Sequence, residues 1–344
     1  MYDAVADLPL SVESLELEYV ERETPDFTRA TTVIELRGGG ETGRGEDVTY
    51  EREHHDALRE SGLDVDAAGE YTLAEFSAFL EDADLWPDEP EREAFRDYRR
   101  WAFEAAALDL ALRQADETLA DRLDRGLDSV RFVVSESVPD GDTSRVETLL
   151  ERYPDAELKL DATAAWTDET FAALADTDAV RVVDLKGRYE GTDVDQAPDA
   201  ELYDRVFAEF PDAVIEDPAL DADTRGVVEA NADRVSWDAP IHGLADVDAL
   251  PFEAGWLNVK PSRFGTVESL FETVSWALEH DVSLYGGGQY ELSVGRGQIQ
   301  ELASLFYPAG PNDVSPGAYN EADVPTDPPE SPISVPDDHA GFGF

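Results

Sequence analysis

Four charged residues stand at the ends of four successive apolar runs in the second half of the chain. The runs are VRVVD, VIE, RVSWD and WLNVK, and their last residues are Asp184, Glu216, Asp238 and Lys260. They are 32, 22 and 22 positions apart, and about 20 to 35 residues accommodate one strand and a returning helix. Because the carboxyl ends of parallel strands meet at one end of a barrel, we expect the four side chains to converge. Three carboxylates beside a lysine indicate a hard divalent cation next to a general base.

The elements that must position these residues follow a regular order. From Ser129 onward, short β-type runs alternate with amphipathic helical ones in about seven repeats, ending with GRGQIQELASLF. This order favours an α/β fold with a parallel (β/α) barrel of seven or eight strands, similar to a TIM barrel, over an open sheet.

The first part of the chain has a different pattern. Residues 10–50 alternate apolar and polar side chains as a meander of half-buried strands does, and the turn-rich run 38–47 is expected to close a hairpin. Residues 52–120 read as helical, and Thr72 could cap one of these helices. We therefore expect an α+β domain over residues 1–125, a barrel over 126–320 and a mostly irregular tail over 321–344.

The composition is strongly acidic. The chain carries 79 acidic and 26 basic residues, for a net charge of −53. This balance argues against nucleic-acid binding, which requires basic surface, and against docking on anionic membranes. The acids are spread along the whole chain, which favours the solvated surface of a protein from a high-salt cytoplasm, where screening is strong. A calcium buffer and a nucleic-acid mimic are the alternatives, but neither needs regular strand–helix order.

Cysteine is absent, so disulfides, thiolate catalysis and Cys-based metal sites are excluded. The sequence contains no run of about 18 apolar residues, and its first residues have neither a basic region nor an apolar core. We expect a soluble, cytoplasmic protein.

The ordered set of motifs resembles the enolase superfamily, and within it the muconate-lactonizing and o-succinylbenzoate synthase branch. ELRGGGETGRGED is similar to the N-terminal hairpin of that family, VIEDP to its fourth-strand carboxylate motif and LNVKPS to its sixth-strand lysine motif. SWDAP matches the fifth strand more loosely. SVPDDHAGFGF resembles the closing segment, which returns to an N-terminal capping domain. A halophilic archaeon fits the acidic composition.

The resemblance implies abstraction of the proton α to a carboxylate, giving a metal-stabilised enediolate. Asp184, Glu216 and Asp238 would then hold Mg²⁺, with Mn²⁺ as an alternative, and Lys260 would be the base. The implied partner is a small-molecule carboxylate substrate, with no nucleic acid or membrane. Members of the family are often dimers or octamers, so a homo-oligomer is expected.

The second and third strands depart from the family pattern. Lys159 falls on the first lysine of the family's Lys-x-Lys motif, but Asp161 replaces the second lysine, and Lys186 stands where an asparagine is usual. Lys159 is a candidate catalytic or carboxylate-binding residue. Asp161 and Lys186 are candidate substrate contacts, and the alternative is that they pair with each other. A racemase needs bases on both faces, so one-base chemistry is favoured.

The run GGGQYELSVGRG follows the seventh strand. Its glycine amides and Arg296 could bind an anion, and Glu291 is a further candidate substrate contact. The alternative is a tight strand–helix turn with no ligand.

Two classes of function remain open. The first is a Mg²⁺-dependent lyase or isomerase, with elimination (dehydration or an o-succinylbenzoate synthase-like step) favoured, and with a cycloisomerase or epimerase as the alternative. The second is a catalytically degenerate barrel that binds a metal or a metabolite, for which Asp161 and the Asp-Ala-Pro of the fifth strand are the support.

Overall fold

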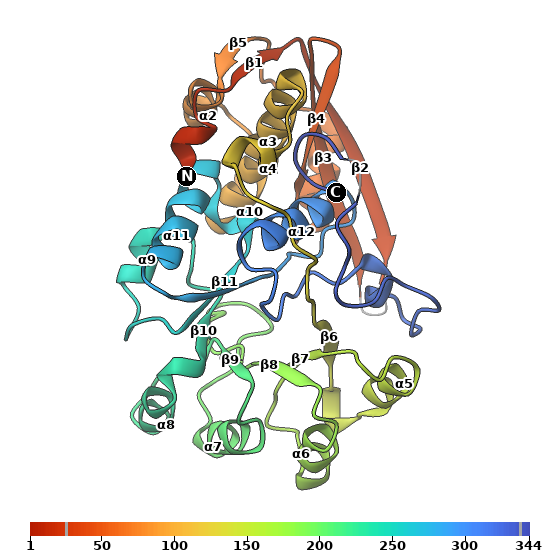
Figure 1. Cartoon of the computed structure of the whole chain (residues 1–344), viewed down its shortest axis with the longest axis vertical. Coiled ribbons are helices and arrows are strands. Elements are labelled where there is room, and N and C mark those ends of the chain that lie inside the picture. Colours follow the sequence, from red (N-terminus) through yellow and green to blue (C-terminus); the bar gives the residue numbers. More distant parts are fainter. Residues whose placement is uncertain (25–26, 337–338) are drawn as a thin grey trace.

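The computed structural model describes residues 1–24, 27–336 and 339–344. It is a mixed α/β fold in which an N-terminal antiparallel sheet and its helices lie beside a parallel barrel (Figure 1). The four excluded residues fall in the loop after Glu23 and in the expected C-terminal tail, so predictions for them lie outside the described residues. In the described part of the chain, no helix combines the length and apolar character needed to cross a membrane.

The N-terminal part is built on two antiparallel sheets. Among the described residues, β2, β3 and β4 form one sheet in that order, and β1 pairs with β5 in the other. Thr72 caps α2 through a reciprocal capping box with Glu75, which confirms the predicted cap. The elements are β1 (Pro9–Val12), β2 (Ser14–Glu23), β3 (Thr28–Gly38), β4 (Glu41–Asp47), α1 (Arg52–Ser61), β5 (Gly69–Thr72), α2 (Leu73–Asp82), α3 (Ala94–Ala115) and α4 (Leu119–Leu123).

The hairpin of residues 38–47 differs from the prediction in one respect. Only Gly39 and Gly40 form the turn, because Gly38 ends β3 and residues 41–47 form strand β4. The glycines inside β4 serve packing, because a Cβ at Gly43 or Gly45 would lie 2.3 Å or 2.0 Å from a backbone oxygen of α3. Helix α3, which is buried without interruption from Trp101 to Leu112, therefore rests directly on the strand backbone.

Seven parallel strands in the described residues form the barrel sheet in the order β12-β11-β10-β9-β8-β7-β6. Strand β6 begins only at Val134, although the β-type pattern starts at Ser129, because Val130 and Phe132 make isolated bridges with later segments instead. The elements are β6 (Val134–Ser137), α5 (Ser144–Arg152), β7 (Leu158–Asp161), α6 (Asp168–Ala175), β8 (Val180–Asp184), α7 (Ala200–Glu209), β9 (Val214–Glu216), α8 (Arg225–Ala230), β10 (Val235–Trp237), α9 (Leu244–Asp248), β11 (Trp256–Val259), α10 (Pro261–Phe264), α11 (Val267–Glu279), β12 (Ser283–Gly286) and α12 (Val294–Phe306).

A short extended segment joins the two edges of this sheet. Asn312 bridges to Phe132 next to β6, and Asp313 bridges to Gly287 at the end of β12. The backbone of Asp313 donates to Gly286 at 2.7 Å, and that of Val133 donates to Asn312 at 2.8 Å. Residues 312–313 thus take the eighth position and cover both open strand edges, which would otherwise expose unpaired backbone groups.

Candidate active site

Alternation along the barrel strands sets which side chains face inward. Val182, Val214 and Tyr285 form a small apolar cluster of their own, separate from the large core between the sheet and its helices. Asp184 lies two residues after Val182 and Glu216 two residues after Val214, so both carboxylates point to the same side as this cluster. They are direct register partners on neighbouring strands.

Asp238, directly after β10, is fully buried and receives three donors on one carboxylate oxygen. Oδ2 lies 2.8 Å from Lys260 Nζ, 2.7 Å from the Tyr189 hydroxyl and 3.3 Å from Arg263 Nη2. Burial opposes ionisation of Asp238, but Arg263 and Lys260 outweigh it and hold its pKa well below the usual value. The other oxygen, Oδ1, is buried and accepts no hydrogen bond from any described residue.

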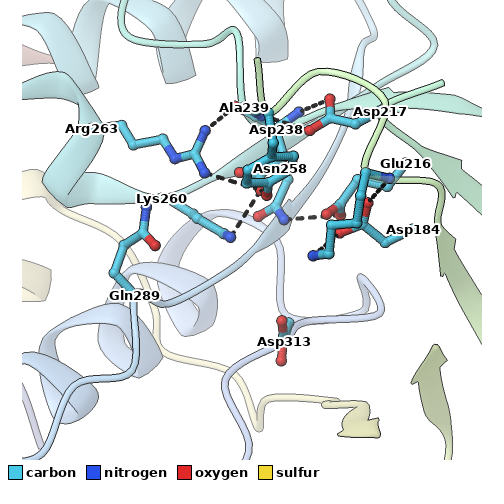
Figure 2. A network of polar contacts seen from close by, with 12 residues as sticks. Asp184, Glu216, Asp217, Asp238, Ala239, Asn258, Lys260, Arg263, Gln289 and Asp313 are labelled. Atoms are coloured by element: carbon cyan, nitrogen blue, oxygen red, sulfur yellow. Dashed lines mark hydrogen bonds and ion pairs between the residues drawn. The ribbon is translucent and has the colours of Figure 1, made fainter. Parts of the chain in front are cut away.

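Glu216, at the end of β9, is held from three directions. Lys159 donates to Oε1 at 2.5 Å, Asn258 donates to Oε2 at 3.0 Å, and the Tyr285 hydroxyl also donates to Oε2. Burial raises the pKa of Glu216, and Lys159 partly offsets this. Figure 2 shows Asn258 between Glu216 and Asp238, with Lys260 and Arg263 approaching Asp238 from the far side.

Asp184, at the end of β8, is paired with lysines. The backbone N–H of Lys186 donates to Oδ1 at 2.9 Å, and Lys186 Nζ lies 2.5 Å from Oδ2. Lys159 Nζ is 3.6 Å from the same Oδ2. Burial acts to lower the pKa of both lysines, but the carboxylates around them raise it well above the usual value. Lys186 also lies 3.4 Å from Asp161, so the predicted pairing of these two residues is present.

Asp217 joins the acidic group through the backbone. Oxygens of Glu216, Asp217 and Asp238 lie within 4.8 Å of one another, close enough to share a metal ion. Both oxygens of Asp217 nevertheless accept backbone N–H groups, from Asp238 at 2.9 Å and from Ala239 at 2.7 Å. Burial, followed by the charge of Asp238, raises the pKa of Asp217. Asp217 therefore fixes the chain after β10. Glu216 also accepts hydrogen bonds on both oxygens, so within the described chain Asp238 Oδ1 is the one carboxylate oxygen of the three residues that accepts none.

The predicted anion cradle after β12 receives a carboxylate from within the molecule. Glu46, from β4, accepts the backbone N–H groups of Leu292, Ser293 and Gly295 at the start of α12. Arg296 lies 3.5 Å from Glu291, which accepts the backbone N–H of Gln289. An external anion would have to displace Glu46 from these N–H groups. Glu291 and Arg296, the two candidate substrate contacts of this run, lie outside the Asp238 network.

The remaining candidates meet at the barrel mouth. One network contains the carboxylates and lysines Asp184, Glu216, Asp238, Lys159, Lys186 and Lys260, with Asp161 at its edge. Sequence reasoning missed Arg263, Asn258, Tyr189 and Tyr285. Two of these had a signal, because Asn258 precedes Lys260 by two positions on the same inward face and Arg263 follows it in KPSR. The two tyrosines come from a loop and from the far edge strand, and no local pattern marks them.

The formal charge of this network is informative. Its carboxylates are Asp161, Asp184, Glu216, Asp217, Asp238 and Asp313, and its cations are Lys159, Lys186, Lys260 and Arg263. With every group ionised, six negative and four positive charges within the described chain leave −2. One divalent cation would neutralise that charge.

Two family descriptions match the chain. Residues 3–122 match "Domain of unknown function (DUF8230) N-terminal domain", and residues 126–321 match the corresponding C-terminal domain. A comparison with curated proteins found no match.

Solved structures of similar fold come from the enolase superfamily. A dipeptide epimerase from Methylococcus capsulatus complexed with a Mg ion is 20% identical with a TM-score of 0.68, covering 92% of this chain and 93% of that one. The muconate lactonizing enzyme from Pseudomonas putida is 18% identical with a TM-score of 0.63, covering 88% of each chain. An enolase superfamily member from Listeria innocua is 16% identical with a TM-score of 0.64, covering 90% and 86%. At these identities the likeness shows the fold: an enolase-type barrel with an N-terminal cap.

Proposed function

We propose that this chain, which belongs to the DUF8230 family, is a metal-dependent enzyme that removes the proton α to a carboxylate. The observation that carries the proposal is the environment of Asp238. One of its oxygens accepts from the amine of Lys260 at 2.8 Å, while the other is buried without a hydrogen-bond donor among the described residues. A single carboxylate thus connects a candidate base to a candidate cation position.

The residues present fit a hard divalent cation. Asp238 Oδ1 and the side-chain oxygen of Asn258 are both buried, and neither has a hydrogen-bond partner within the described chain. Such oxygens are costly to bury unless something binds them, and Mg²⁺ prefers oxygen ligands. The network charge of −2 supports the same ion. Asp184, Glu216 and Asp238 are the proposed ligands of Mg²⁺ or Mn²⁺, and the bound ion would supply Lewis-acid charge beside the substrate carboxylate.

The chain's own residues would divide the remaining work. Lys260 Nζ would accept the α-proton, and its buried position keeps water from competing. Asp238 holds that amine in place, and Arg263 in turn orients Asp238 by donating to its backbone oxygen at 2.9 Å. Asn258 and Lys159 orient Glu216. These contacts would present a fixed arrangement of charge to the reacting carbon.

Elimination is the favoured reaction within this class. Asp161 stands where a second base would be, which supports one-base chemistry such as dehydration or an o-succinylbenzoate synthase-like step. The likeness to muconate lactonizing enzyme and to a dipeptide epimerase keeps cycloisomerisation and epimerisation as alternatives. The substrate class is a small-molecule carboxylate. We also propose a high-salt cytoplasm, in line with the net charge of −53, and a homo-oligomer, in line with the resemblance to the enolase superfamily.

A second candidate function is a barrel that binds a metal or metabolite without turnover. Its support is specific: Asp184 already accepts two hydrogen bonds from Lys186, and Asp161 replaces the second lysine of the family's Lys-x-Lys motif.

Proton exchange with solvent tests the first proposal. The chain would be incubated in D₂O with a panel of carboxylic acids and Mg²⁺, and deuterium at the α-carbon would be measured by mass spectrometry and NMR. We expect exchange or turnover that chelation of the metal abolishes, and that Lys260→Met reduces by a factor of about 10³ or more without loss of Mn²⁺ binding.

Mn²⁺ titration separates the two candidates. Specific binding of one ion with no exchange for any acid in the panel would favour the binding function. No specific ion binding above that of the acidic surface would reject the metal-dependent enzyme and the metal-binding barrel alike. Exchange that survives Lys260→Met would remove Lys260 from the base role.

A further inference from the structure

Lys186 pairs with Asp184, one of the proposed metal ligands. Its ammonium lies 2.5 Å from Asp184 Oδ2, and its own backbone N–H donates to Oδ1 at 2.9 Å. Both oxygens of Asp184 therefore accept a hydrogen bond from one residue. A carboxylate oxygen that is paired with an ammonium is a poorer ligand, since the two cations compete for the same charge.

The backbone holds Lys186 in this position. Its φ of 51° lies in the left-handed region, which a lysine adopts at a cost, so the surrounding contacts must maintain it. The turn brings the side chain back over the end of β8, where its ammonium can reach Asp184. This geometry indicates that the fold itself places the Lys186 ammonium beside Asp184.

Lys186 has a second set of partners close by. Its ammonium is 3.4 Å from Asp161 and 5.0 Å from the centre of the Tyr189 ring. Asp161 is partly exposed, whereas Asp184 is fully buried. A small rotation of the lysine would therefore move its charge from Asp184 to Asp161, and the ring of Tyr189 offers a further favourable contact.

We infer that Lys186 is a tethered cation that competes with the divalent ion for Asp184, and that Asp161 receives its ammonium when the ion binds. The inference rests on the proposed metal site and goes beyond it. It assigns Lys186 and Asp161 to control of metal affinity, and it makes both residues positioning groups rather than substrate contacts.

Mn²⁺ titration of single variants gives the first test. Measurements by calorimetry and water-proton relaxation in 1 M KCl would suppress weak binding to the acidic surface, because the Debye length there is about 3 Å. Lys186→Asn should bind Mn²⁺ about tenfold more tightly than the unmodified chain, equivalent to about 1.4 kcal/mol. Lys186→Gln is a second variant should the first fold poorly, as judged by thermal melting.

Arg188 provides the matched control. It lies two residues after Lys186, and no ion pair links it to a carboxylate in the described ranges. Arg188→Asn removes the same charge without freeing Asp184, so it should change the affinity for Mn²⁺ by about threefold or less in high salt. If both substitutions changed the Mn²⁺ affinity equally, the loss of a nearby positive charge would be sufficient to explain the change. That result would overturn the inference.

A double-mutant cycle tests the role of Asp161. Asp161→Asn should weaken Mn²⁺ binding about fivefold in the unmodified chain, because Lys186 then has fewer alternatives to Asp184, and by less than about twofold in the Lys186→Asn background. Equal weakening in both backgrounds would contradict the transfer of the ammonium. If no variant binds Mn²⁺ specifically, the proposed metal site fails. If all variants bind it equally, only the competition fails.

Discussion

The carboxylate of Glu46 accepts the backbone N–H of Gly295 at 2.9 Å, and so joins strand β4 of the N-terminal sheet to the first turn of barrel helix α12. The same carboxylate accepts the N–H groups of Leu292 and Ser293. These donors are unsatisfied inside the helix, and the helix dipole favours an anion there. The run that looks in sequence like an anion site is thus used to attach the two halves of the molecule.

Replacement of Glu46 should therefore cost stability. Glu46→Ala leaves three buried or partly buried N–H groups without an acceptor, and we expect the free energy of unfolding to fall by about 3 kcal/mol. Glu46→Gln keeps one acceptor oxygen and should cost about half as much. Urea unfolding provides the measurement. Glu41→Gln, at the exposed start of the same strand, is the control, and an equal loss there would remove Glu46 from this role.

Two glycine substitutions should act in opposite directions. A Cβ at Gly45 would lie 2.0 Å from the backbone oxygen of Ala102 in α3, and backbone cannot yield as a side chain can. We expect Gly45→Ala to destabilise the chain by about 3 kcal/mol or more. Gly226, within α8, has nothing within 4 Å, so Gly226→Ala should stabilise by up to about 1 kcal/mol. Thermal melting distinguishes the two variants, and similar changes in their melting temperatures would contradict the packing argument.

The order of the strand ends could be predicted because it depends on a local regularity. In a parallel barrel every strand ends at the same rim, so Asp184, Glu216, Asp238 and Lys260 needed only correct strand assignment to be placed together. Alternation then decides which neighbours also face inward, which is how Asn258 could have been found from its distance to Lys260.

The rest depends on contacts between distant segments. The glycines of residues 38–47 read as turn residues, and only the approach of α3 explains their place in a strand. Glu46 looks like any acidic residue in a chain with 79 of them. Whether Lys186 would pair with Asp161 or Asp184 depends on a left-handed backbone conformation that its sequence does not signal.

The buried pair of Asp47 and Arg99 should be essential for folding. Arg99 Nε lies 2.8 Å from Asp47, both side chains are fully buried, and the guanidinium stacks on Trp86 at 3.5 Å. Burial opposes ionisation of Asp47, but Arg99, together with His55 and the hydrogen bonds from Thr49, outweighs it and lowers the pKa to about 2. Because this folded-state pKa is depressed, the stabilisation is present above about pH 4 and is lost as the pH falls through 2.

Arg99→Met should lower the free energy of unfolding by about 3 to 5 kcal/mol at pH 7, since it leaves a buried charge unpaired. Adding Asp47→Asn should recover part of the loss, a result that only coupled residues give. Arg225→Met removes an arginine that pairs with Glu229 at the surface and should cost less than about 1 kcal/mol. Additive losses in the double variant would contradict the pairing.

Glu301, on α12, should make stability fall as the pH rises through neutrality. It is fully buried, and burial, followed by the charge of Asp109, raises its pKa to about 7. It accepts the backbone N–H of Gly343 in the C-terminal tail. Because the folded-state pKa lies above the unfolded one, the stabilisation is complete below about pH 4.5 and disappears as the pH passes 7.

Glu301→Gln removes this titration while keeping an acceptor for Gly343. Between pH 5 and pH 9 the unmodified chain should lose on the order of 3 kcal/mol relative to the variant, by the conversion of 1.36 kcal/mol per pKa unit. Urea unfolding at unit steps of pH gives both curves. For Glu272→Gln, at an exposed position of α11, the curve of unfolding free energy against pH should run parallel to that of the unmodified chain. Parallel curves for Glu301→Gln as well would mean that Glu301 ionises in the folded chain as readily as it does in the unfolded one.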